Sequence, residues 1–197
     1  MSDPRRALRH GDALIVVDVQ TDFCPGGALP IEGGDEVVPV LNRWIDAAVN
    51  AHVPVVASRD WHPSEHVSFK PSGEWPIHCV QGTSGARFHP ALRLPHSANV
   101  VTKGNRSDRD QYSAFDGTGL AAELRNQDVQ RVWIGGLAQD VCVRATVLDA
   151  RHEGFDTIVI ADATRPVTAA GGERANEEMR RAGARFETTD NRERDKE

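Results

Sequence analysis

The sequence has little cysteine, little lysine and no long apolar run, and each shortage excludes a class of protein. Apolar runs such as residues 13–17 and 157–161 are much shorter than the roughly 20 residues that a membrane-spanning helix needs. Three cysteines are too few for a disulfide framework and fit a reducing compartment. Arg5, Arg6 and Arg9 precede a strand-like segment rather than the apolar core of a signal peptide. We therefore expect a soluble, cytoplasmic protein.

The charge balance limits the possible partners. The chain has 23 basic and 29 acidic residues, a formal net charge of -6. Dispersed negative charge argues against nucleic acid or an anionic membrane as a partner. The lysines are Lys70, Lys103 and Lys196, and all other basic side chains are arginines or histidines. Because the pKa of lysine shifts more readily than that of arginine, a lysine at a strand end is a candidate for a chemical role.

The 197 residues predict a doubly wound α/β fold, with about six mainly parallel strands and helices on both faces of the sheet. Short β-branched runs predict strands at residues 13–19, 54–59, 99–102, 131–135, 157–161 and 184–188. Apolar residues at helical spacing predict helices at residues 35–51, 119–126, 140–153 and 172–182. We expect residues 1–190 to form a single domain and residues 191–197 to be a charged, disordered tail.

Two segments interrupt this alternation. Residues 61–96 have no convincing period and contain five of the eight histidines, and a shorter break covers residues 104–117. A long irregular segment within a compact domain is usually functional or disordered, and the aromatic residues of this one argue against disorder. In open α/β sheets ligands bind at the carboxyl ends of the strands, so the polar residues there are the first candidates for a site.

Three such residues could carry nucleophilic chemistry. Asp18 ends the first predicted strand, Lys103 closes the third, and Cys142 follows the fourth in the first turn of a predicted helix. A helix N-terminus favours a thiolate and offers backbone N–H groups to an oxyanion. Taken singly, each residue has an ordinary alternative: a helix cap for the aspartate, a surface position for the lysine and core packing for the cysteine.

The irregular segment also carries a set of metal-ligand residue types. Asp60 and His62 alternate as the chain leaves the second strand, so both point to the same side of an extended backbone, and His66 and His78 follow. One carboxylate with two or three imidazoles suits zinc, iron or manganese. Cys79 is a further thiolate candidate, although it would point away from His78 in an extended chain. The alternative is that these are loop histidines that only form hydrogen bonds.

Together these segments resemble the nicotinamidase branch of the isochorismatase-like cysteine hydrolases. The similarity runs in the family's order from about residue 13 to residue 189. It is carried by residues 18–24 (DVQTDFC), 60–63 (DWHP), 75–80 (WPIHCV), 102–104 (TKG) and 136–143 (GLAQDVCV).

The resemblance implies a catalytic triad. Cys142 would be the nucleophile, Asp18 the base that takes its proton, and Lys103 the cation that holds the pair in its reactive charge state. The family has a cis peptide bond before the residue that matches Ala138, so the N–H groups of Ala138 and Cys142 would form the oxyanion hole.

The resemblance also implies a metal ion beside the triad. Its ligands would be Asp60, His62 and His78, with His66 as a fourth ligand in some members of the family. Zinc is the expected ion, and iron or manganese are alternatives.

The implied reaction is the hydrolysis of nicotinamide, and of its analogue pyrazinamide, through a cysteine thioester, in NAD salvage. Phe23 and Trp75 match the family's aromatic walls around the substrate ring. The chain departs from the family pattern at Gln139, where many members have threonine, and at residues 105–111, which are more polar. Both departures bear on substrate range more than on reaction type.

Three other functions compete with this interpretation. A related hydrolase of ureido or carbamoyl amides would usually lack the metal ligands. An enzyme whose metal activates water directly would leave Cys142 a structural role. A metal-binding or partner-binding domain without activity would not need a complete triad at three strand ends.

Overall fold

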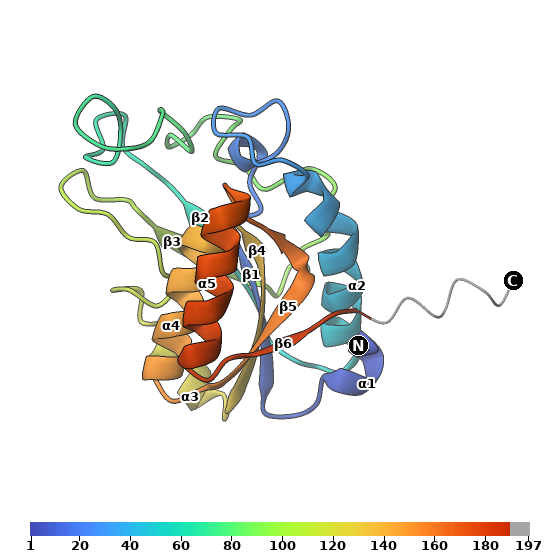
Figure 1. The fold of residues 1–197 in the computed structure, drawn as a ribbon. Helices are drawn as coiled ribbons and strands as arrows, with labels where there is room; N and C mark the ends of the chain where they lie inside the picture. The colour runs from blue at the N-terminus through green and yellow to red at the C-terminus, as the bar shows by residue number, and fades with distance from the viewer. Residues whose placement is uncertain (190–197) are drawn as a thin grey trace, which may run out of the picture.

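Runs of aliphatic and β-branched residues form a parallel sheet, as expected for strands that are buried on both faces. The computed structural model describes residues 1–189, and the sheet in this part of the chain has the order β3-β2-β1-β4-β5-β6 (Figure 1). The pairs in this sheet are all parallel. The strands are β1 (Asp12–Val17), β2 (Val55–Asp60), β3 (Asn99–Lys103), β4 (Arg131–Leu137), β5 (Asp156–Arg165) and β6 (Arg185–Glu187).

Helices cover both faces of the sheet, which confirms the doubly wound fold. α1 (Pro4–Ala7) and α2 (Val37–Asn50) lie on one side, and α3 (Leu120–Asn126), α4 (Arg144–His152) and α5 (Ala169–Arg181) lie on the other (Figure 1). Alternate residues of β1 divide between two cores: Leu14 and Val16 pack in the core that contains Trp44 of α2, and Ile15 and Val17 in the opposite one. The sheet is thus a buried layer between two helical layers.

Several element boundaries differ from the prediction. β1 ends at Val17 rather than at residue 19, because Asp18 turns the backbone to a φ of +47°. Residues Gln139–Val143 form a π-helix ahead of α4 rather than its first α-helical turn. α5 begins at Ala169, three residues before the predicted start, after the N-cap residue Thr168. The four-residue helix α1 was not predicted, since it is too short to show a helical period.

The segment after β2 is irregular, as predicted. From Trp61 to Ala98 the described chain contains no helix or strand, and isolated bridges such as His62 with Val80 hold its parts together. No helix among the described residues has the length and apolar character needed to span a bilayer. The expected tail, residues 191–197, lies outside the described residues, and the single-domain boundary at residue 190 stays a prediction.

The strand order determines where a site can form. β1 is the first strand of the chain, and its neighbours β2 and β4 continue the sheet in opposite directions. α2, which follows β1, and α4, which follows β4, therefore lie on opposite faces of the sheet. A crevice forms outside the carboxyl ends of the strands at such a switch point.

Candidate active site

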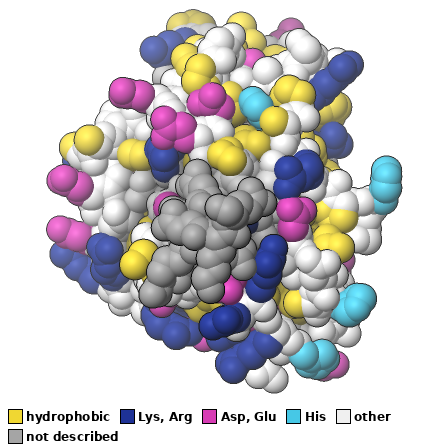
Figure 2. Space-filling view, turned by 90° about the vertical axis from the view of Figure 1, so that its right-hand side faces the viewer, with side chains coloured by type: hydrophobic (Ala, Val, Ile, Leu, Met, Phe, Trp, Pro, Cys, Tyr) yellow, Lys and Arg dark blue, Asp and Glu magenta, His cyan; other side chains and the backbone are white. Residues whose placement is uncertain are grey.

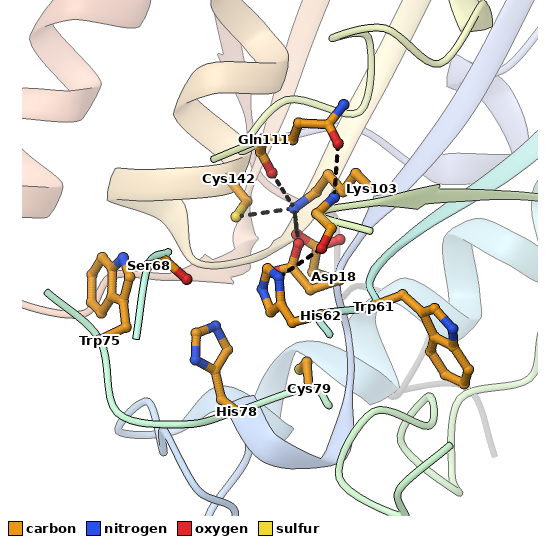
Figure 3. Close-up of polar contacts among 12 residues, drawn as sticks. Asp18, Trp61, His62, Ser68, Trp75, His78, Cys79, Lys103, Gln111 and Cys142 are labelled. Atoms are coloured by element: carbon orange, nitrogen blue, oxygen red, sulfur yellow. Dashed lines mark hydrogen bonds and ion pairs between the residues drawn. The ribbon is translucent and has the colours of Figure 1, made fainter. Parts of the chain in front are cut away.

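Four strand ends meet at this crevice and each contributes a reactive side chain. Asp18 follows β1, Asp60 ends β2, Lys103 ends β3, and Cys142 follows β4. Asp60 and Lys103 are direct partners in the parallel register of β2 and β3. Figure 3 shows the side chains of Asp18, Lys103 and Cys142 pointing toward one another.

Lys103 is at the centre of the group. Its Nζ lies 2.7 Å from Asp18 Oδ2, 2.6 Å from Asp60 Oδ1 and 3.4 Å from Cys142 Sγ. Its side chain is completely buried. A buried ammonium needs opposite charges and hydrogen bonds around it, and the two carboxylates supply them. The expected contact between cation, carboxylate and nucleophile is therefore present.

Asp18 is held in place by its backbone and by a neighbouring strand. Its positive φ turns the side chain away from the path of β1, and Ser58 Oγ donates a 2.7 Å hydrogen bond to its Oδ1. Its Oδ2 pairs with the Lys103 ammonium but has no hydrogen bond of good geometry from any described residue. This buried oxygen is suited to receive a proton.

Burial and charge act against each other at these groups. Burial raises the pKa of Asp18, and Lys103 partly offsets this effect. Burial also raises the pKa of the Cys142 thiol well above its usual range, with the Lys103 ammonium opposing the rise. Although burial disfavours its charge, the carboxylates of Asp18 and Asp60 raise the pKa of Lys103 well above normal. The resting site therefore holds a neutral thiol and a fixed ammonium.

The backbone around Cys142 has three unusual features, of which the resemblance implied only the first. The Leu137–Ala138 peptide bond is cis. Gly136 has a φ of +130°, and a Cβ there would overlap Val17 of β1, so only glycine fits. The chain then enters the π-helix Gln139–Val143, in which the N–H groups of Val141 and Val143 both donate to the carbonyl oxygen of Ala138.

The metal-ligand candidates lie beside the triad. One donor atom each from Asp60, His62 and His78 lies within 4.8 Å of the others, and all three side chains are buried. His62 Nδ1 donates to the carbonyl oxygen of Gly104 at 2.9 Å, and His78 Nδ1 donates to that of Pro76 at 2.8 Å. These bonds leave Nε2 of each ring with a free lone pair.

This donor set fits a divalent metal ion. Asp60 uses Oδ1 for Lys103, and its Oδ2 lies 3.7 Å from His62 Nε2. Burial lowers the pKa of His78, which favours the neutral imidazole that can act as a ligand. Two imidazoles and one carboxylate, with backbone carbonyls fixing the rings, are typical of zinc and of other borderline divalent ions.

His66 lies outside this group, although its ring is 4.2 Å from that of His62, centroid to centroid. The backbone N–H and the hydroxyl of Ser68 both contact its Nδ1, at 3.2 and 2.6 Å. Its Nε2 donates to the carbonyl oxygen of Arg109 at 3.1 Å. Both ring nitrogens are thus engaged in hydrogen bonds, and the bond to Arg109 joins the two irregular segments.

Cys79 is also outside the group of ligands. It is buried, and burial raises the pKa of its thiol, which opposes the thiolate form that binds metals. Its backbone N–H donates a 2.7 Å hydrogen bond to Asp22 Oδ2. This hydrogen bond ties the loop that carries His78 to the segment after β1.

Sequence reasoning missed several residues that position the site. The buried Gln20 side chain accepts a hydrogen bond from the N–H of Asp60 and donates to its carbonyl oxygen, each at 2.8 Å. Gly104 has a φ of +64°, and a Cβ there would lie 2.5 Å from Cε1 of His62. Gln111 accepts from the N–H of Gly104 at 3.2 Å (Figure 3). The sequence features that could have identified these residues are the motif around residue 20 and the glycine that follows Lys103.

A pocket lies between Cys142 and two of the metal donors, Asp60 and His78, all of which line it. Two aromatic walls of the pocket are joined by a hydrogen bond, which Trp75 Nε1 donates to the hydroxyl of Tyr112 at 3.1 Å. The expected walls Phe23 and Trp75 are both present. The lining residues are Phe23, Leu29, Ile31, Asp60, Trp75, His78, Tyr112, Ala138, Val141, Cys142 and Val167. The pocket is thus mostly apolar, with the reactive groups on its inner wall.

Comparison with known proteins agrees with this geometry. Residues 12–191 match the isochorismatase domain family. The nicotinamidase/pyrazinamidase of Mycobacterium tuberculosis is 42% identical over 179 residues, covering 86% of this chain and 95% of that protein.

Solved structures share the fold at similar identity. The pyrazinamidase of Pyrococcus horikoshii in complex with zinc superimposes with a TM-score of 0.87 at 45% identity, covering 90% of this chain and 99% of that one. The PnC1 protein of L. infantum in complex with nicotinate has a TM-score of 0.84 at 38% identity, covering 91% and 93%. The chain belongs to the isochorismatase family, in its nicotinamidase branch.

Proposed function

We propose that this protein is a nicotinamidase that hydrolyses nicotinamide to nicotinic acid and ammonia, and pyrazinamide to pyrazinoic acid, in NAD salvage. The observation that carries the proposal is the contact of Lys103 with both Asp18 and Cys142, beside a pocket that is lined by Cys142 and by two of the three grouped metal donors, Asp60 and His78. Relatives named as nicotinamidases at 37–42% identity support the substrate.

The first step generates the nucleophile. Asp18 takes the thiol proton of Cys142, and the resulting thiolate lies beside the Lys103 ammonium. The transfer replaces one buried anion with another next to the same cation, so the number of buried charges is unchanged. The thiolate then attacks the carboxamide carbon.

The remaining steps follow from the same groups. The N–H groups of Ala138 and Cys142 are the proposed oxyanion donors, and such a donor contributes about 2.7–4 kcal/mol to transition-state stabilisation. Asp18 returns the proton to the departing ammonia. A water molecule, deprotonated by Asp18, then hydrolyses the thioester and releases the acid.

Asp60, His62 and His78 would hold one divalent metal ion, for which we propose zinc. A metal ion bound there would supply Lewis acidity to the ring nitrogen of the substrate, so the three ligands would help to orient the ring. Phe23 and Trp75 lie on the walls of the same pocket, where they can pack on the ring. His66 is proposed to remain outside the ligand set, and a cytoplasmic location stays a prediction.

The test is release of ammonia and nicotinic acid from nicotinamide by the zinc-loaded protein, the chelated protein and Cys142→Ala. We expect turnover only in the zinc-loaded wild type, restored in the chelated protein by added zinc. Cys24→Ala, at another buried cysteine, serves as the control. Nicotinamide left intact by the loaded wild type would refute the substrate, and full activity of Cys142→Ala would refute the mechanism.

A further inference from the structure

We propose that Val167, held in position by Asp140, is a specificity-determining residue that limits which ring-substituted pyridine carboxamides enter the pocket. The inference rests on the proposed function and concerns one wall of the same site. Val167 lines the pocket from the segment between β5 and α5, and it is 38% exposed. It therefore lies where the pocket opens to solvent.

The position of Val167 is fixed by a carboxylate on the segment Gln139–Val143, which carries Cys142 and is called the nucleophile segment below. Asp140 Oδ1 accepts a hydrogen bond from the N–H of Val167 at 2.8 Å, and its Oδ2 accepts from the N–H of Thr168 at 3.3 Å. Asp140 is two residues before Cys142 in the π-helix Gln139–Val143. One side chain therefore connects the pocket wall to the nucleophile and sets the distance between them.

The start of α5 is shaped to fit this carboxylate. Thr168 Oγ1 accepts a hydrogen bond from the N–H of Gly171 at 3.0 Å, which caps the helix. A Cβ at Gly171 would overlap Asp140 Oδ2, and one at Gly172 would lie 2.9 Å from Cβ of Pro166. Gly171 thus lets the helix approach Asp140, and Gly172 lets it approach Pro166, more closely than other residues would.

The nucleophile segment has backbone hydrogen bonds that do not involve Asp140. The N–H groups of Val141 and Val143 donate to the carbonyl oxygen of Ala138 at 3.1 and 3.0 Å. Loss of the Asp140 carboxylate should therefore release the wall at Val167 and leave Cys142 in place. That separation distinguishes a role in substrate selection from a role in the chemical step.

The first test compares substrates. Steady-state rates are measured on nicotinamide and on its four methyl derivatives, which are isomers of one another and carry the methyl group at ring carbon 2, 4, 5 or 6. The enzymes compared are the wild type, Val167→Ala and Val167→Phe. Because one methyl group in an apolar pocket changes kcat/KM by about 10–200-fold, Val167→Ala should raise the kcat/KM of at least one isomer relative to nicotinamide about tenfold. Val167→Phe should lower the same ratio.

Val49→Ala, at an exposed valine of α2, is the control and should leave the ratios unchanged. If all four ratios stay within twofold of wild type in both Val167 variants, the inference is overturned. If the wild type fails to hydrolyse nicotinamide, the proposed function fails instead, so the two failures are distinguishable.

The second test addresses the positioning role of Asp140. Asp140→Ala should raise the KM for nicotinamide at least fivefold with kcat within threefold, and leave the alkylation rate of Cys142 unchanged. Asp140→Asn should raise KM less, because its amide oxygen can still accept from the N–H of Val167. Glu177→Ala, on α5 but paired only with Arg181 in the described contacts, is the control.

A KM within twofold of wild type in both Asp140 variants overturns the positioning role. So does a fall in kcat together with slower alkylation of Cys142, since that result places Asp140 in the support of the nucleophile. Should Asp140→Ala fail to fold, Asp140→Asn provides the same comparison.

Discussion

The two halves of the site solve the problem of buried charge in different ways. The nucleophile half has its own cation, because Lys103 contacts Asp18, Asp60 and Cys142 within 3.4 Å. The other half directs lone pairs from His62 and His78 toward Asp60, with each histidine's outer nitrogen fixed on a backbone carbonyl. Lone pairs that face one another in a buried site repel, and a cation between them stabilises the arrangement.

The halves also differ in how the chain builds them. Asp18, Lys103 and Cys142 come from three different strand ends, so the sheet itself sets their separation. His62 and His78 come from one irregular segment, which depends on local hydrogen bonds. Asp60 belongs to both halves, since one of its oxygens faces the ammonium and the other faces the metal donors. We therefore expect substitutions in the nucleophile half to reduce activity by removing charge. Substitutions in the metal half should reduce metal binding by removing or displacing a ligand.

The largest expected effect is at Lys103. Lys103→Met keeps the length of the side chain and removes its charge, which leaves two buried carboxylates without a cation. We expect loss of activity on the order of 10⁴-fold and of stability by about 3–5 kcal/mol. Activity is measured by ammonia release and stability by denaturant unfolding.

The double variant Asp18→Asn with Lys103→Met should recover part of the stability and none of the activity. Lys70→Met, at an exposed lysine, is the control. Activity within tenfold of wild type in Lys103→Met would contradict the role of the cation.

The second-largest expected effect distinguishes His78 from His66, whose rings both lie against that of His62. His78→Ala should weaken zinc binding at least 100-fold, because it removes a ligand. His66→Ala should leave zinc affinity within about threefold and lower the melting temperature, since His66 connects Ser68 with Arg109. Competition with a chromogenic chelator measures the affinity, and equal losses in the two variants would place His66 among the ligands.

A third effect tests geometry without removing a ligand. Gly104→Ala places a Cβ 2.5 Å from the His62 ring, so the ring must move and zinc affinity should fall about 10–100-fold. Gly82→Ala is a matched control, because Gly82 also has a positive φ but no atom lies within 4 Å of its added Cβ. Comparable zinc affinities for the two variants would refute the contact.

The smallest effect concerns pH. Ser58 donates to Asp18 and lowers the pKa of that carboxyl, while burial raises it. Since Asp18 must be ionised to take the thiol proton, Ser58→Ala should move the acid limb of kcat/KM to higher pH. The plateau should stay within about threefold of wild type. Ser107→Ala, at an exposed serine, should leave the profile unchanged, and an acid limb that stays in place in Ser58→Ala would contradict the assignment.

The sequence predicted much of this arrangement, and the misses have physical causes. The short β-branched runs gave the strands, because burial on both faces of the sheet selects such residues. The early start of α5 was missed, since it depends on how Gly171 packs against Asp140, and the π-helix at Gln139–Val143 was missed, since it depends on the hydrogen bonds that Ala138 accepts. Contacts of that kind leave no periodic signal along the chain.

The sequence by itself determined the chemistry: one thiol, one isolated lysine and a set of carboxylates and imidazoles at the ends of predicted strands. Only the tertiary structure decided which of these side chains meet. His62 and His66 are four residues apart and their rings touch, yet only His62 faces Asp60 and His78. The physical reason is that hydrogen bonds orient each ring: His62 donates to the distant carbonyl oxygen of Gly104, whereas His66 is held by nearby Ser68 and by the distant carbonyl oxygen of Arg109.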